Sequence, residues 1–349
     1  MAPRATRGNA MKKKVTSKTV AELAGVSQSA VSRTFTQGAS VSSKTREKVI
    51  KVADSLGYRP NAIARSLSTR STKLIGLIMA RMSEPFYADV LHRFTAVLQE
   101  KGYSTLLLHT YAGKDVEQVL SLALQYQVEG LICASSTLTT SLAEQCASRG
   151  VPLVVFHRFS EQDGGANLVR CDHFQGGRLL AEELVKSGHR RIAFIAGASS
   201  SSTSLEREKG FIEGLSRHDV RLWLRAQVHS YEYSEGVAVA RAMLHESMRP
   251  DAVFAFNDIM AMAVVDCARD SGLSVPGDLS VVGFDGIEIG QQGGYRLTTI
   301  KQPTEEMVRV SVELLMRSIA NPGAKFESRV LPGVLLRGSS ARLSPEQGQ

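Results

Sequence analysis

Eight short apolar runs, separated by stretches with helical periodicity, follow Lys73 and limit what this chain can fold into. The runs occupy residues 74–79, 105–109, 131–134, 153–156, 191–196, 226–229, 252–256 and 279–284. Amphipathic segments between them include residues 88–101, 173–186, 235–246 and 259–270. Short apolar runs of this kind are typical of strands that are buried on both faces. The alternation therefore predicts an α/β fold, in which helices cover both faces of parallel sheets.

The length of this region indicates two lobes rather than one sheet. About 270 residues are involved, more than a single doubly wound sheet of ordinary size requires. We expect the join near residues 167–172, with one lobe made roughly of 74–171 and 301–328 and the other of 172–300 and 329–343. Ligands in such folds bind outside the carboxyl ends of the strands, which predicts a site in the cleft between the lobes.

Positive charge is concentrated in the first fifth of the chain. Residues 1–70 contain 14 Lys and Arg against 3 Asp and Glu, a net charge of +11, whereas the rest of the chain has a net charge of −3. Such segregation predicts a small module that faces a polyanion, joined to a larger body with another task. For residues 1–14 alone, a flexible basic tail that aids solubility is the favoured interpretation.

The segment 15–59 has the pattern of a helix-turn-helix domain. Three helices are predicted, at residues 18–24, at 28–35 and from about 42 to 56. Gly25 suits the tight turn after the first helix, and Ser27 is a residue type that caps the start of a helix. A helix, a glycine turn, a second helix and a supporting helix together form the DNA-binding arrangement.

The second of these helices has one apolar and one polar face. Val31 and Phe35 are four residues apart and face inward, while the outward positions are Gln28, Ser29, Ser32 and Arg33. Glutamine pairs with adenine and arginine with guanine in the major groove, and serine serves a base edge or a phosphate. The alternative is an ordinary solvated helix face.

Residues 60–73 have the composition of a linker. Pro60 breaks the chain, residues 61–67 are long enough for two helical turns, and residues 68–73 are polar. Such a short helix is marginal in isolation.

Motifs along nearly the whole chain match a known family. Those before residue 74 include VAELAGVS at 20–27, AVSR at 30–33, VSSKTREKV at 41–49 and LGYRPNAIARSL at 56–67. Those after it include GHRRIAFIAG at 188–197, NDIMA at 257–261, VPGDLSVVGFD at 275–285 and LTTI at 297–300. Together they resemble the LacI/GalR family of bacterial transcriptional regulators. The resemblance implies an all-α helix-turn-helix headpiece and an α/β core of two parallel, doubly wound sheets, similar to a periplasmic sugar-binding protein.

The same resemblance implies roles for individual headpiece residues. Gln28 and Ser29 take the positions that discriminate operators, and Arg33 takes that of a shared base contact. Residues 61–67 correspond to a hinge helix, whose Leu67 wedges a central base step in the minor groove, as an apolar side chain can. The predicted DNA-binding residues are Thr16, Ser27, Gln28, Ser29, Ser32, Arg33, Asn61, Ala64 and Leu67.

A small-molecule effector is implied for the inter-lobe cleft. The predicted effector-binding residues are Phe86, Tyr87, His157, Arg158, Arg207, Tyr231, Asn257 and Asp285. Carboxylate and amide oxygens accept hydroxyl hydrogen bonds, and aromatic rings stack on a sugar face. Arg158 and Arg207 hint at a sugar acid or sugar phosphate, although cleft arginines also bind neutral polyols. Asn257 and Asp285 also suit helix caps, and His157 suits a core position.

We therefore expect a regulator of transcription, with repression the favoured mode, that binds a palindromic operator as a homodimer and responds to a sugar, sugar acid or related metabolite. The alternative is a soluble sugar-binding receptor without a DNA role. An enzyme is not expected, because the sequence lacks nucleophile-elbow, phosphate-loop, dinucleotide and zinc-protease motifs. Four separated cysteines favour neither a metal site nor disulfides. No cofactor or membrane segment is expected, the location is expected to be cytoplasmic, and residues 344–349 form a tail without a heptad.

Overall fold

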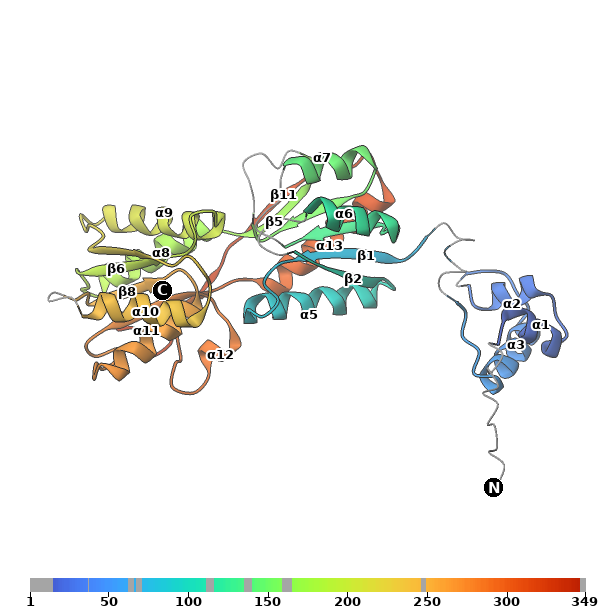
Figure 1. The fold of residues 1–349 in the computed structure, drawn as a ribbon, viewed down its shortest axis with the longest axis horizontal. Helices are drawn as coiled ribbons and strands as arrows, with labels where there is room; N and C mark the ends of the chain where they lie inside the picture. Colours follow the sequence, from blue (N-terminus) through green and yellow to red (C-terminus); the bar gives the residue numbers. More distant parts are fainter. Residues whose placement is uncertain are drawn as a thin grey trace, which may run out of the picture. The chain divides into compact units, whose positions relative to one another are not determined.

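The computed structural model describes residues 15–36, 38–61, 66, 71–110, 116–134, 140–158, 165–245 and 249–345. The chain forms two compact units, residues 1–72 and residues 73–349 (Figure 1). We describe each unit by itself and call residues 15–61 the headpiece and residues 73–345 the core.

The headpiece is a bundle of three helices, α1 (Ser17–Ala24), α2 (Gln28–Thr34) and α3 (Ser43–Ser55). Each begins after a hydroxyl side chain that accepts a hydrogen bond from a backbone N–H of the first turn, supplied by Thr16, Ser27 and Ser42. Gly25 ends α1 in the left-handed conformation, with φ at 62°. The three helices bury a small core of Val20, Ala21, Ala24, Val31, Val49 and Ala53.

One lobe of the core is built on a sheet of six parallel strands in the order β2-β1-β3-β4-β5-β11. The strands are β1 (Leu74–Met79), β2 (Ser104–His109), β3 (Gly130–Cys133), β4 (Leu153–Phe156), β5 (Asn167–Cys171) and β11 (Ser328–Leu331). Its helices are α5 (Pro85–Glu100), α6 (Val116–Gln125), α7 (Thr140–Ser148) and α13 (Thr304–Ala320). We call this the first lobe. Helices α5 and α13 pack together on one face, and α6 packs with α7.

The second lobe has a six-stranded sheet in the order β7-β6-β8-β9-β10-β12. The strands are β6 (Ile192–Ala196), β7 (Leu224–Gln227), β8 (Ala252–Ala255), β9 (Ser280–Asp285), β10 (Thr298–Lys301) and β12 (Val334–Leu336). The helices are α8 (His173–Lys186), α9 (Ser202–Ser216), α10 (Tyr233–Leu244), α11 (Asp258–Asp270) and α12 (Glu288–Gln291). Only the pairing of β12 with β10 is antiparallel among the described strands. The predicted fold class, a helical headpiece with two mostly parallel α/β lobes, is confirmed.

The chain passes between the lobes three times, after β5, after β10 and after β11 (Figure 1). Two of the expected lobe boundaries are displaced. Lys301 ends β10 in the second lobe, and residues 329–331 belong to β11 in the first. Strand β11 is mostly exposed and lacks the apolar run by which buried strands are predicted. Within the described part of the chain, no helix is long and apolar enough to span a membrane.

Two glycines allow α8 and α9 to pack backbone against backbone. A Cβ on Gly177 would lie 2.2 Å from the carbonyl oxygen of Arg207, and a Cβ on Gly210 would lie 1.9 Å from that of Phe174. Both distances are far below van der Waals contact, so no larger residue fits. This close packing fixes the position of Arg207, along the axis of α9, relative to α8.

Substitution Gly210→Ala is expected to lower the free energy of unfolding by about 1–3 kcal/mol, because the added methyl group forces the two helices apart. At an open helical site the same change stabilises by up to about 1 kcal/mol. Urea unfolding measures the difference. The control is Lys209→Ala, an exposed neighbour on α9 that should change stability little. A stabilised Gly210→Ala variant would contradict the packing described.

Candidate functional site

Helix α2 presents a polar face to solvent. Gln28, Ser29, Ser32 and Arg33 are exposed, as predicted, while Val31 and Thr34 are buried against the other helices. Arg46 of α3 donates a hydrogen bond to the carbonyl oxygen of Thr34, at 2.6 Å, and so fixes the end of α2. The face is therefore held rigidly, with its polar side chains available to a partner.

Some of these side chains already have hydrogen bonds within the headpiece. Gln28 Nε2 donates to Ser17 Oγ at 2.9 Å, and Ser27 Oγ accepts from the N–H of Ala30 while capping α2. Thr16 is exposed at the start of α1, with its Oγ1 accepting from the N–H of Thr19. Asn61 is exposed. Ala64, Leu67 and most of the predicted hinge helix lie outside the described residues.

In the core, an arginine joins the ends of several elements of the second lobe. Arg207 of α9 is 2 % exposed, and its Nη2 lies 2.9 Å from Asp285 Oδ1 at the end of β9. Its Nη1 donates to the carbonyl oxygen of Phe256 after β8, and its Nε donates to Nδ1 of His173 at the start of α8. The guanidinium carbon lies 3.8 Å from the ring centre of Phe284. Gln302 also donates to Asp285, at 2.8 Å.

Two buried histidines, His157 of the first lobe and His173 of the second, lie beside this arginine. The ring centres of His157 and His173 are 5.2 Å apart, and that of His157 is 4.7 Å from Phe86. Burial, reinforced by the positive charge of Arg207, holds the pKa of both histidines well below the usual range. Both rings are therefore neutral at pH 7, and each has one donor and one acceptor nitrogen.

Two further arginines lie around Tyr231. Arg158, which follows β4, donates through Nε to Tyr87 Oη at 3.1 Å. The guanidinium of Arg81, after β1, stacks on the Tyr231 ring with its carbon 3.3 Å from the ring centre, and Arg158 lies 5.8 Å from the same centre. Because Tyr231 belongs to the second lobe, these contacts join the lobes.

Asn257 and the residue beside it have clear structural roles. Asn257 Oδ1 caps α11 by accepting from the N–H of Met260 at 2.9 Å. Asp258 accepts from the N–H of Ile287 and from Thr299 Oγ1, and so anchors the loop after β9. Burial, reinforced by the negative charge of Asp285, raises the pKa of Asp258 to about 8.

The structure therefore brings the predicted effector residues together, with Asn257 engaged as a helix cap. It adds four residues that the sequence did not reveal, which are Arg81, Glu84, His173 and Gln302. Among the residues that the structure describes, five buried polar atoms of this inter-lobe cluster make no hydrogen bond within 3.5 Å, namely Arg81 Nη1, His157 Nδ1, His173 Nε2, Tyr231 Oη and Gln302 Oε1. Buried polar groups are normally paired, so such a concentration points to a ligand.

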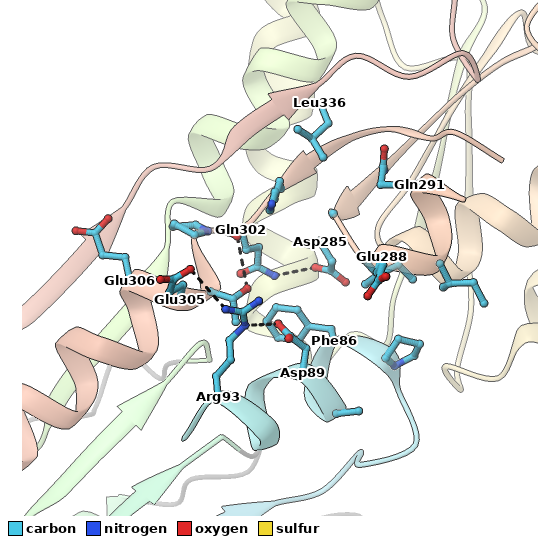
Figure 2. Close-up of a pocket in the computed structure, with 18 of the residues that line it drawn as sticks. Phe86, Asp89, Arg93, Asp285, Glu288, Gln291, Gln302, Glu305, Glu306 and Leu336 are labelled. Carbon is cyan, nitrogen blue, oxygen red and sulfur yellow. Dashed lines mark hydrogen bonds and ion pairs between the residues drawn. The ribbon is translucent and has the colours of Figure 1, made fainter. Parts of the chain in front are cut away.

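A cavity of about 1210 Å³ adjoins the cluster and is lined by both lobes (Figure 2). Phe86, Asp285 and Gln302 line it, together with Asp89 and Arg93 of α5. The other predicted effector residues do not line this cavity. Among the described residues, no group of three or more His, Cys, Asp and Glu could hold a metal ion, and the four cysteines are buried and free.

Replacing Arg207 by Met should lower the free energy of unfolding by about 3–5 kcal/mol, because the carboxylate of Asp285 would lose its buried partner. The matched control is Arg225→Met. Arg225 pairs with Glu208 at 2.5 Å but is 41 % exposed, so its loss should cost less than about 1 kcal/mol. Urea unfolding compares the two variants, and equal losses would show that Arg207 does not organise the lobe.

Two family descriptions match parts of the chain. Residues 16–61 match the lacI family of bacterial regulatory proteins, and residues 181–340 match a periplasmic binding protein-like domain. The chain is 31% identical over 333 residues to the HTH-type transcriptional repressor PurR of Photobacterium profundum, covering 93% of this chain and 98% of that protein. It is 34% identical over 333 residues to the ribose operon repressor of Haemophilus influenzae, with the same coverage.

Solved structures agree with these relatives. The chain resembles the lac repressor dimer bound to operator and the anti-inducer ONPF, with a TM-score of 0.84, 29% identity, and coverage of 95% of this chain and 100% of that one. It also resembles the complex of the transcriptional regulator CelR with cellobiose, with a TM-score of 0.71, 30% identity, and coverage of 94% and 100%. With relatives above 30% identity over almost its whole length, the chain belongs to the lacI family of bacterial regulatory proteins.

Proposed function

We propose that the chain is a transcriptional repressor that binds a palindromic operator as a homodimer and is switched by a small molecule held between the lobes of its core. The observation that carries this proposal is the exposed polar face of α2, on a rigid and basic headpiece. The favoured alternative from another class, a receptor without a DNA role, would need no such helix.

Base recognition follows from the chemistry of that face. Arg33 is suited to O6 and N7 of guanine, and Gln28 to N6 and N7 of adenine. Gln28 would exchange its present bond to Ser17 for a base contact, so the headpiece holds this side chain ready in the absence of DNA. Ser29 and Ser32 would contact base edges or phosphates.

A homodimer is proposed because one headpiece reads only one half-site, and the two-fold symmetry of a dimer matches a palindrome. The lac repressor, which this chain resembles, was solved as a dimer on its operator. In the proposed complex, two copies of the 61–67 hinge segment pair in the minor groove, where Leu67 separates a base step and kinks the duplex.

The effector is proposed to bind the inter-lobe cluster and to change the separation of the hinge segments by moving one lobe against its dimer mate. The related CelR binds cellobiose, and another relative was solved with ribose. A coupling free energy of about 1–3 kcal/mol is enough for such a switch. We propose no enzymatic activity, and a cytoplasmic location, because the target is chromosomal DNA.

Selection of binding sites from random duplex DNA by the full-length protein should yield a palindrome. At near-physiological salt, affinity for that site should exceed affinity for random duplexes by about 10³-fold or more. Removal of residues 1–72 should abolish this binding and leave metabolite binding by the core intact. If no sequence is enriched, the repressor assignment is wrong.

Substitution Arg33→Ala should weaken operator binding by about 1–3 kcal/mol and relax the preference at one base pair in each half-site. The control Lys51→Ala removes an exposed positive charge from α3 and should affect all sequences alike. Fluorescence anisotropy with single-base operator variants measures both effects. An unchanged base preference in Arg33→Ala would rule out the assigned recognition face.

A further inference from the structure

We propose that the effector is a small polyhydroxylated anion, either a sugar acid or a sugar phosphate, whose negative group binds between Arg158, Arg81 and Tyr231. This inference rests on the proposed function and deepens it by naming the class of effector. It depends on contacts within the core alone, so it can be tested without DNA.

The first observation is the isolation of Arg158. This residue is 5 % exposed, and its side chain donates to the hydroxyl of Tyr87. Considering only residues that the structure describes, no carboxylate oxygen lies within 4.0 Å of its guanidinium nitrogens. A buried charge without a counter-ion costs several kcal/mol, so the missing partner is expected to be supplied by a ligand.

The second observation is the pair of unpartnered atoms beside Arg158. Arg81 Nη1 and Tyr231 Oη are both buried, and neither makes a hydrogen bond within 3.5 Å in the part of the chain that the structure describes, although Arg158, Arg81 and Ser201 lie near enough to the phenol to lower the pKa of Tyr231. They come from opposite lobes, and the guanidinium carbon of Arg81 lies 3.3 Å from the centre of the Tyr231 ring. An anionic group with two or three oxygens can accept from Arg158, Arg81 and the phenol together. Binding of that group would therefore join the two lobes.

Charge in the cluster favours an anion. Arg207 is paired with Asp285, at 2.9 Å, and Arg81 with Glu84, at 3.4 Å, whereas Arg158 has no carboxylate within 4.0 Å among the residues that the structure describes and interacts with Glu84 only at longer range. The pKa of Tyr231 reflects this field: burial alone would raise it, but the guanidiniums of Arg158 and Arg81 lower it. The two neutral histidines add no positive charge at pH 7.

The rest of the cluster is suited to hydroxyl groups. His157 Nδ1, His173 Nε2 and Gln302 Oε1 are buried and make no hydrogen bond within 3.5 Å in the described part of the chain, and Asp285 accepts hydrogen bonds. Hydroxyl groups both donate and accept, so a polyol satisfies such a mixed set, and the ring of Phe86 offers an apolar surface for its carbon face. A simple inorganic anion would leave these atoms unsatisfied.

Calorimetric titration of the full-length protein with matched ligands tests the proposal. The probes are D-glucose, D-gluconate and D-glucose 6-phosphate; D-galactose and D-galacturonate; and D-ribose and D-ribose 5-phosphate. At least one anion should bind about tenfold or more tightly than its neutral counterpart, and the acid and phosphate arms distinguish the two sources of charge. Binding of a neutral sugar as tightly as its anion, or of no anion at all, would overturn the proposal.

Arginine variants separate a ligand-binding role from a structural one. Arg158→Met should remove the preference for the anion while leaving the ligand-free thermal midpoint unchanged or raised, because an uncompensated buried charge is lost. Arg81→Gln should lower the affinity for the anion about tenfold. This variant replaces Arg158→Met in the test if Arg158→Met fails to fold. Arg217→Ala removes an exposed arginine directly after the end of α9 as a control and should change nothing. Retained anion preference in both Arg158→Met and Arg81→Gln would contradict the site.

Glu84 provides a variant with the opposite effect. Burial raises the pKa of Glu84 to about 7. The positive charges of Arg81 and Arg158 act to lower this pKa, and the negative charges of Asp285 and Glu232 act to raise it. Gluconate should therefore bind more tightly at pH 6 than at pH 8, because protonated Glu84 no longer competes for Arg81. Glu84→Gln should bind gluconate more tightly at pH 8 and lose the pH dependence. This test applies if the titrations identify a sugar acid. A weaker Glu84→Gln variant would refute the competition.

Failure of this inference and failure of the proposed function are distinguishable. A neutral sugar that binds and releases operator DNA would refute the anionic effector and leave the repressor assignment intact. If an anion binds the core but the full-length protein shows no sequence preference for DNA, the repressor assignment is refuted and the anionic effector stands.

Discussion

The buried ion pair between Arg207 and Asp285 is the interaction on which the geometry of the core depends. Its guanidinium reaches the end of β9, the carbonyl group after β8 and the start of α8, so one side chain fixes the carboxyl edge of the second sheet. The glycines of α8 and α9 determine its position, because only their bare backbones let the two helices approach so closely. Packing thus determines where the charges lie.

Charge then determines what the site can hold. In the second lobe Arg207 is paired with Asp285, whereas Arg158 of the first lobe has no carboxylate within 4.0 Å among the described residues. Arg81 and Tyr231 meet across the lobes, and in the part of the chain that the structure describes each carries a buried polar atom with no hydrogen bond within 3.5 Å. A ligand that pairs with these groups contacts both lobes at once, so its binding free energy depends on how the lobes are arranged. A ligand must bind one arrangement more tightly than another in order to shift the equilibrium between them. The same contacts therefore account for recognition and for switching.

Much of the fold was predictable because its signals are local. Helix starts at Ser27 and Ser42 follow from hydroxyl caps, and β1 and β4 follow from apolar runs. Strands β11 and β12 were missed because exposed strands carry no such run, and β5 and β10 were missed because polar residues interrupt their short sequences. In the site, Arg207 and Asp285 were predicted from the resemblance, but Arg81 and Glu84 lie in a loop, and Gln302 lies just after β10. Their convergence depends on how the lobes meet, which no local pattern encodes.

The central claim is that ligand binding in the inter-lobe cluster changes the affinity of the protein for operator DNA. The most direct measurement is the dissociation constant of the selected operator for the full-length protein, with and without a saturating cluster ligand, at one fixed salt concentration. The account predicts a change of about 5- to 150-fold in either direction, and a reciprocal change in ligand affinity when operator is present. An operator affinity that is the same with and without bound ligand would contradict it.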